Sequence, residues 1–121
     1  MNIAVVGTGY VGLVSGACLA DIGHRVVCID KDKQKIENLK KGILPIYEPG
    51  LDEVVNRTVE SGSLSYATSI KEGIVDAEVI YLCVGTPPRA NGSADLSYVF
   101  SAAKEIGESL DHYAVIVSKS T

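Results

Sequence analysis

Short apolar runs alternate with amphipathic stretches along the 121-residue chain. Five of these runs are rich in the β-branched residues that favour strands. They are NIAVVG at 2–7, RVVCID at 25–30, LSYAT at 64–68, EVIYLCVG at 78–85 and YAVIVSKS at 113–120. Strands that alternate with helix-length segments are typically parallel and joined by crossover helices. The pattern therefore predicts an α/β fold with a doubly wound, mostly parallel sheet of about five strands.

Four stretches between the strands carry apolar residues at helical spacing. The first is expected to begin near Tyr10 and to end around Gly23, a natural helix stop. Its expected packing face consists of Val14, Ala17, Cys18 and Leu19. The other helices are expected over 32–41 with Gly42 as terminator, over 51–60, and from a cap at Ser93 or Asp95 to about 109.

Two loops are longer than a simple connection requires. GILPIYEPGL at 42–51 contains two prolines within five residues, and GTPPRANGSAD at 85–95 follows the fourth predicted strand. Loops at the carboxyl ends of parallel strands are where α/β proteins bind ligands. The second loop is therefore expected to border a binding cleft.

Length, charge and hydropathy narrow the class of protein. A chain of 121 residues suits one domain, and its formal net charge of −4 with scattered Lys and Arg offers no basic surface for nucleic acid. No apolar run approaches the roughly 18 residues of a membrane span, and no signal-peptide core is visible. The sequence favours a cytoplasmic protein that binds neither nucleic acid nor a membrane.

The three cysteines give no sign of a disulfide framework or a metal site. Cys18, Cys28 and Cys83 are odd in number, widely spaced and embedded in apolar patterns. We expect all three to be buried, reduced thiols, since free cysteine packs like a small hydrophobe. His24 and His112 each stand alone near a strand start, so no metal is expected there.

The glycines of GTGYVG, which follow the first predicted strand, suggest chemistry. Gly7, Gly9 and Gly12 form G-x-G-x-x-G, a strand precedes them, a helix follows, and Asp30 ends the next strand 18 positions after Gly12. In a dinucleotide-binding βαβ unit the first glycine permits the turn, the second admits a pyrophosphate and the third allows close helix packing. The alternative is a purely structural turn, but the context favours a Rossmann-like nucleotide site.

Asp30 is the residue expected to select the dinucleotide. A carboxylate at this position accepts hydrogen bonds from both adenosine ribose hydroxyls and repels a 2′-phosphate, which favours NAD over NADP. The alternative is a strand-end acid that caps the following helix. Lys31 and Lys35 moderate the preference, because a nearby cation tolerates a phosphate.

Beyond the glycine motif, the sequence resembles the UDP-glucose/GDP-mannose dehydrogenase family in PIYEPGL, VGTPPRANGSADLSYV and VIVSKST, which together with GTGYVG span essentially the whole chain. The resemblance implies an NAD-binding domain. Independently of it, Thr86 and Thr121 follow predicted strands, which places them at the carboxyl ends of the sheet. The cofactor-binding residues it implies are Gly7, Gly9, Tyr10, Val11, Gly12, Asp30, Lys35, Thr86 and Thr121, the two threonines on the nicotinamide side.

The resemblance also implies an activity for a longer protein. Family members oxidise the C6 alcohol of a nucleotide sugar to an acid in two NAD-dependent steps that use a cysteine nucleophile. UDP-glucose is the favoured substrate; GDP-mannose, a UDP-N-acetylhexosamine, or a non-catalytic NAD/NADH-sensing role are the alternatives. None of the three cysteines matches the nucleophile motif, so no catalytic residue is assigned within residues 1–121.

The chain looks like an incomplete amino-terminal portion of such an enzyme. The family's central helix and sugar-nucleotide domain have no counterpart in the printed sequence. We therefore expect it to bind NAD without turning over a UDP-sugar. Exposed apolar surface is expected to allow self-association into a homo-oligomer.

Overall fold

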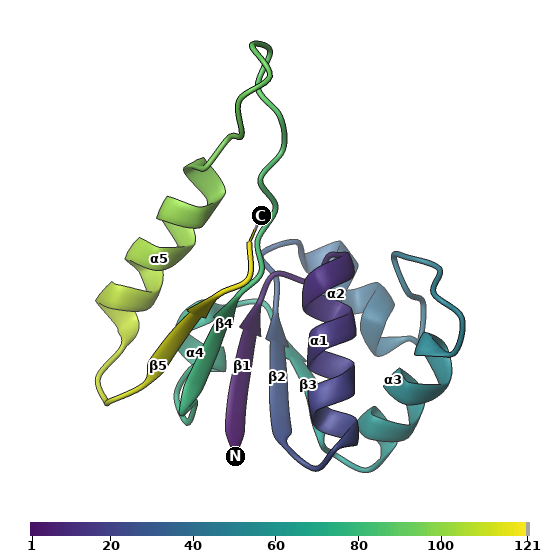
Figure 1. Cartoon of the computed structure of the whole chain (residues 1–121). Helices are drawn as coiled ribbons and strands as arrows, with labels where there is room; N and C mark the ends of the chain where they lie inside the picture. Colours follow the sequence, from purple (N-terminus) through teal and green to yellow (C-terminus); the bar gives the residue numbers. More distant parts are fainter. Residues whose placement is uncertain (121) are drawn as a thin grey trace.

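In the computed structural model, which describes residues 1–120, five short strands form one parallel sheet. All five runs predicted from the sequence are strands. Their order across the sheet is β3-β2-β1-β4-β5, with every neighbouring pair parallel. The strands are β1 (Asn2–Val6), β2 (Arg25–Ile29), β3 (Leu64–Ala67), β4 (Val79–Leu82) and β5 (Val115–Ser118). The predicted doubly wound architecture is confirmed (Figure 1).

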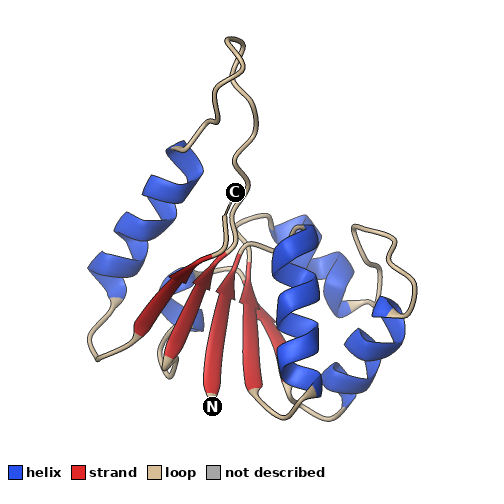
Figure 2. Ribbon diagram, viewed as in Figure 1, coloured by secondary structure: helices blue, strands red, loops and turns tan. Residues whose placement is uncertain are grey.

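Helices cover both faces of this sheet (Figure 2). One face packs against α1 (Tyr10–Asp21), α2 (Lys33–Lys40) and α3 (Leu51–Glu60), and the other packs against α4 (Ile70–Gly73) and α5 (Ser97–Ser109). Strand β1 supplies both cores, because Ile3 and Val5 belong to the first cluster while Ala4 and Val6 belong to the second. Side chains alternate across a strand, so a continuous apolar run serves two layers at once.

The winding direction reverses beside β1. From β1 the chain moves outward through β2 to β3, then returns to pair β4 with the opposite edge of β1. Connections leave the carboxyl ends of β1 and β4 toward opposite faces, which opens a crevice between them. The sheet order therefore fixes where a ligand can enter.

Helix α1 packs through smaller residues than the sequence suggested. Its buried positions are Gly12, Leu13, Gly16, Ala17 and Ala20, whereas Cys18 is exposed and Val14 and Leu19 are half-buried. A Cβ on Gly16 would lie 2.6 Å from the Cys28 Sγ, so the helix comes close to β2. The expectation that Cys18 is buried was wrong, because the buried face of α1 is centred on Leu13, Gly16, Ala17 and Ala20, and Cys18 lies outside it.

One helix was not predicted, and the start of another was left open between two residues. Helix α4 was not predicted, since four residues capped by the Ser69 side chain are too few to show a periodicity. Helix α5 starts at Ser97, and the Asp95 carboxylate accepts a 2.9 Å hydrogen bond from the Ser97 N–H. Ser93 bonds Asn91 instead, so only Asp95 contributes to the helix start.

No helix within residues 1–120 has the length and apolarity needed to cross a membrane.

His112 links two connections at the amino ends of the strands. Its Nε2 lies 2.7 Å from the carbonyl oxygen of Ala77, and its Nδ1 lies 3.0 Å from the carboxylate of Asp111. These two hydrogen bonds, followed by the charges of Asp111 and Asp76, raise the pKa of His112 above its ordinary value despite an opposing effect of burial. The protonated imidazole therefore stabilises the contact between the α5–β5 and α4–β4 connections.

Replacing His112 with Gln should weaken the pH dependence of folding stability near neutrality. A raised pKa means that His112 stabilisation is complete below the unfolded value of about 6.5 and is lost as pH rises through the folded value. Urea unfolding midpoints should therefore fall across this range in the unaltered chain and fall less in His112→Gln. His24→Gln is the control, and identical pH profiles for the unaltered chain and His112→Gln would exclude this role.

Candidate functional site

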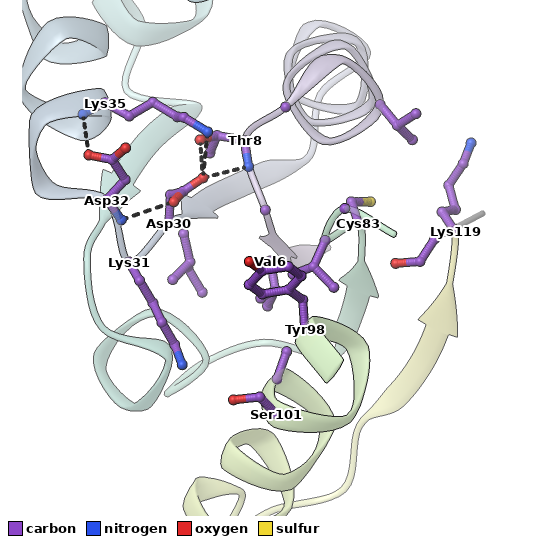
Figure 3. A pocket seen from close by; sticks show the side chains of 18 of the residues that line it. Val6, Thr8, Asp30, Lys31, Asp32, Lys35, Cys83, Tyr98, Ser101 and Lys119 are labelled. Carbon is purple, nitrogen blue, oxygen red and sulfur yellow. Dashed lines mark hydrogen bonds and ion pairs between the residues drawn. The ribbon is translucent and has the colours of Figure 1, made fainter. Parts of the chain in front are cut away.

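A cleft of about 690 Å³ lies at the carboxyl ends of β1, β2 and β4. The β1–α1 loop, the end of β2 and the start of the loop after β4 border it, and α5 contributes Tyr98 and Ser101 from the opposite side (Figure 3). This is the crevice that the sheet order creates. A cleft therefore lies at the position where the sequence predicts ligand binding.

Gly7 makes the turn from β1 into the cleft. Its φ of 105° lies in the region that favours glycine, and its N–H donates a 2.8 Å hydrogen bond to the Ile29 carbonyl. A Cβ here would lie 2.6 Å from the Cys83 carbonyl oxygen. Both the dihedral angle and the close approach of the β4 backbone exclude a side chain.

The next two glycines of the motif have opposite surroundings. Nothing lies within 4 Å of a Cβ built on Gly9, the N-cap residue directly before α1. A Cβ on Gly12 would instead collide with the Gly7 carbonyl oxygen and contact the Cys83 Cβ. Gly9 therefore leaves space at the cleft, whereas Gly12 lets the first turn of α1 rest on the loop that Gly7 forms.

The amino terminus of α1 is available to an anion. Gly9 provides no side-chain cap, and no acidic residue occupies the first turn. The unpaired N–H groups of a helix start and the positive end of its dipole attract negative charge. Tyr10 and Val11 of this turn line the same cleft.

Asp30 stands beside this loop in a network of donors (Figure 3). Its Oδ2 accepts from the Thr8 hydroxyl at 2.6 Å and the Thr8 N–H at 3.1 Å, and its Oδ1 accepts from the Asp32 N–H at 3.0 Å. Lys35 Nζ lies 3.5 Å from Oδ2. Burial opposes ionisation, but these hydrogen bonds and the lysine together lower the pKa of Asp30 below its ordinary value. These contacts therefore favour the ionised form of the Asp30 carboxylate at the cleft.

The alternative role considered for Asp30 belongs to Asp32. The Asp32 carboxylate caps α2 by accepting from the N–H groups of Gln34 and Lys35, each at 3.1 Å. Asp30 makes no such bond to the first turn of α2 among the described residues; it joins the glycine loop to the residue before the helix. Its carboxylate is thus directed to the cleft rather than used as a helix cap.

Most of the predicted cofactor residues gather at the cleft. Gly7, Gly9, Tyr10, Val11, Asp30 and Lys35 line it, while Gly12 is buried beneath the loop. Thr86 is half-buried between Gly85 and Pro87, which line the cleft, although Thr86 itself is not among the lining residues of the described chain. Thr121 lies outside the described residues.

Several lining residues were missed by the sequence analysis. Thr8, Tyr98, Ser101 and Lys119 also border the cleft. Thr8 occupies a variable position of the glycine motif, so only its hydrogen bond to Asp30 reveals a role. Tyr98 and Ser101 lie one helical turn apart on α5. The sequence gives no sign that this helix faces the glycine loop across the cleft.

The cysteines do not offer a thiolate to the cleft. Burial, followed by the proximity of Cys83, raises the pKa of Cys28 to about 12. Burial also raises the pKa of Cys83, which lines the cleft, against a smaller opposing effect of Lys119. Cys18 is exposed but borders a separate hollow with Ser15 and Ile22. Burial therefore disfavours the thiolate form of both Cys28 and Cys83.

Comparison with known proteins gives a consistent assignment. Residues 1–121 match the sequence model described as the UDP-glucose/GDP-mannose dehydrogenase family, NAD binding domain. The chain is 52% identical over 122 residues to a UDP-glucose 6-dehydrogenase of Rhizobium meliloti and 55% identical over 120 residues to UDP-glucose 6-dehydrogenase TuaD of Bacillus subtilis. These matches cover 100% and 99% of this chain but only 28% and 26% of the relatives. The chain thus spans about a quarter of their length.

Solved structures agree with the sequence comparison. A UDP-glucose dehydrogenase from Pyrobaculum islandicum superposes with a TM-score of 0.94 at 41% identity, over 99% of this chain and 28% of that one. A GDP-mannose dehydrogenase from Pseudomonas aeruginosa, solved as a ternary complex, gives a TM-score of 0.95 at 37% identity, over 100% and 28% respectively. The arrangement of strands and helices is therefore shared with dehydrogenases that act on different nucleotide sugars.

Gly12→Ala should lower the free energy of unfolding by about 1–3 kcal/mol, because the added Cβ displaces the backbone of the glycine loop. Gly107→Ala is the matched control: it is also a helical glycine, and nothing lies within 4 Å of its added Cβ. That variant should be neutral or gain up to about 1 kcal/mol from helix propensity. Urea denaturation measures both, and equal changes would show that the contact with Gly7 is not a constraint.

Proposed function

Since the chain belongs to the UDP-glucose/GDP-mannose dehydrogenase family as its NAD-binding domain, we propose that it holds NAD for a UDP-glucose 6-dehydrogenase. When bound, the cofactor would supply the hydride acceptor for oxidation of the sugar at C6. The observation that carries the proposal is the Asp30 carboxylate beside an uncapped helix start in the cleft. The carboxylate offers a hydrogen-bond acceptor to a ribose, and the helix start offers a positive end to a pyrophosphate. Both lie in the same cleft.

The residues present suit the cofactor. The open space at Gly9 admits a pyrophosphate, and the N–H groups at the start of α1 hold its charge. Asp30 and Lys35 offer an acceptor and a donor to the hydroxyls of the adenosine ribose. We assign Thr86 to the nicotinamide side, which is supported by the neighbouring Gly85 and Pro87, since both line the cleft. Thr121 is assigned to the same side from the family resemblance alone.

The proposed sugar is glucose carried by UDP. Relatives named UDP-glucose 6-dehydrogenase are 52% and 55% identical to this chain, compared with 37% for the GDP-mannose dehydrogenase structure. The backbone fold alone favours neither sugar, because the two solved dehydrogenases superpose equally well. The substrate therefore rests on sequence similarity rather than on the shape of the domain.

The chain should bind NAD more tightly than NADP in a calorimetric titration, because the Asp30 carboxylate repels a 2′-phosphate. Asp30→Ala should weaken NAD binding by about tenfold to a hundredfold, equivalent to roughly 1.5–3 kcal/mol for a hydrogen bond to a charged group. It should also narrow the preference over NADP. Asp52→Ala, an exposed acid on α3, is the control. Equal affinities for NAD and NADP in the unaltered chain would overturn the ribose assignment.

The 121-residue chain incubated with NAD and UDP-glucose should form no NADH. The described residues supply a cofactor cleft but no reactive thiolate, since burial raises the pKa values of Cys28 and Cys83 and Cys18 lies away from the cleft. The full-length protein that contains these residues should form NADH, followed by absorbance, with UDP-glucose and less readily with GDP-mannose. NADH formation by the short chain would place catalytic groups within it.

A further inference from the structure

Two threonines are the polar residues fully buried in the described part of the chain. Thr58 is 2% exposed and donates its hydroxyl to the Val54 and Val55 carbonyls of its own helix, so it serves α3 locally. Thr8 is 0% exposed and donates its hydroxyl to Asp30, on the neighbouring strand end. The Thr8 hydroxyl therefore bonds a carboxylate of the cleft, whereas the Thr58 hydroxyl bonds only its own helix.

The contact between Thr8 and Asp30 fixes the carboxylate from one side. The hydroxyl bond of 2.6 Å is short, as expected where the acceptor is ionised, and the Thr8 N–H reaches the same oxygen at 3.1 Å. With Lys35 Nζ at 3.5 Å from the same atom, Oδ2 faces three donors and is committed to the protein. Rotating the carboxylate away would leave a buried hydroxyl without a partner, which is costly.

The remaining acceptor capacity lies on the other oxygen. Oδ1 accepts one hydrogen bond, from the Asp32 N–H at 3.0 Å, and keeps a second lone-pair direction. Lys35 Nζ, which lies 3.5 Å from Oδ2, places an ammonium donor beside the same carboxylate. Thr8 and Asp32 together therefore leave Asp30 a single free acceptor direction rather than the two that a bidentate ribose contact requires.

We propose that Thr8 is a positioning residue for cofactor selection, whose hydroxyl holds Asp30 in the orientation that accepts one ribose hydroxyl and repels a 2′-phosphate. The inference rests on the proposed function, since it needs NAD in this cleft. Lys35 donates to the second ribose hydroxyl in this arrangement. Without the Thr8 hydroxyl, the carboxylate turns away more freely, so contact with the ribose weakens and repulsion of a phosphate weakens with it.

Thr8→Val tests the proposal because it keeps the branched shape and the backbone N–H and removes only the hydroxyl. Dissociation constants for NAD and NADP, measured by calorimetry, should give an NAD preference reduced by about threefold to tenfold. Thr8→Ser, which retains a hydroxyl, should restore most of that preference. Thr58→Val removes the other buried threonine hydroxyl and should leave the NAD/NADP ratio unchanged, whatever it does to stability.

A double-mutant cycle separates positioning from a structural effect. In an Asp30→Ala background, Thr8→Val should no longer change the NAD/NADP ratio, because the carboxylate it orients is gone. An unchanged ratio in Thr8→Val alone, or the same loss in both backgrounds, would overturn the proposal while leaving NAD binding established. Failure of the unaltered chain to bind NAD would instead overturn the proposed function.

Folding is checked alongside by thermal unfolding. Where Thr8→Val does not fold, Thr8→Ala supplies a smaller variant that also lacks the hydroxyl and is expected to show the same reduced ratio. An NMR titration of the Asp30 carboxyl gives a readout without cofactor: loss of the hydroxyl bond should raise the Asp30 pKa, and Thr8→Ser should return it toward the original value. An unchanged Asp30 titration in the hydroxyl-free variant would also contradict the proposal.

Discussion

The close stacking of three backbone segments at Gly7 is the constraint on which the rest of the site depends. The Cys83 carbonyl lies beneath Gly7, and the first turn of α1 rests on the Gly7 carbonyl at Gly12. No side chain fits at either position, so the backbones that follow β1 and β4 and the first turn of α1 pack directly against one another. This contact sets the direction of α1 and brings its amino terminus to the cleft.

Close approach through small residues continues away from the loop. Gly16 brings α1 near Cys28 on β2, and Gly73 at the end of α4 leaves no room for a Cβ against Ile29. The helices on both faces therefore lie near the central strands, whose side chains Val5, Val26 and Ile80 are fully buried. Tight layers of this kind keep the strand ends, and the groups they carry, in fixed positions.

Electrostatics at the cleft follows from that fixed geometry. The loop delivers both Thr8 donors to Asp30, and the capped start of α2 delivers the Asp32 N–H to the other oxygen. An ionised carboxylate in a half-buried place is stable only because these donors outweigh the effect of burial. The first turn of α1 holds no acidic residue, so one cleft presents both a carboxylate and the positive end of a helix.

The sequence by itself determined the five strands, most helix bounds, the glycine turn and the place of Asp30 at a strand end. These features rest on local rules: continuous apolar runs of strand length, glycine at a tight turn, and position along a strand. Only the tertiary structure decided that Cys18 is exposed, that four residues after Ser69 form α4, and that Thr8 holds Asp30. Helix α4 is too short to show a periodicity in the sequence. The exposure of Cys18 and the contact of Thr8 with Asp30 depend on which distant segments pack together, and the order of residues along the chain does not show that.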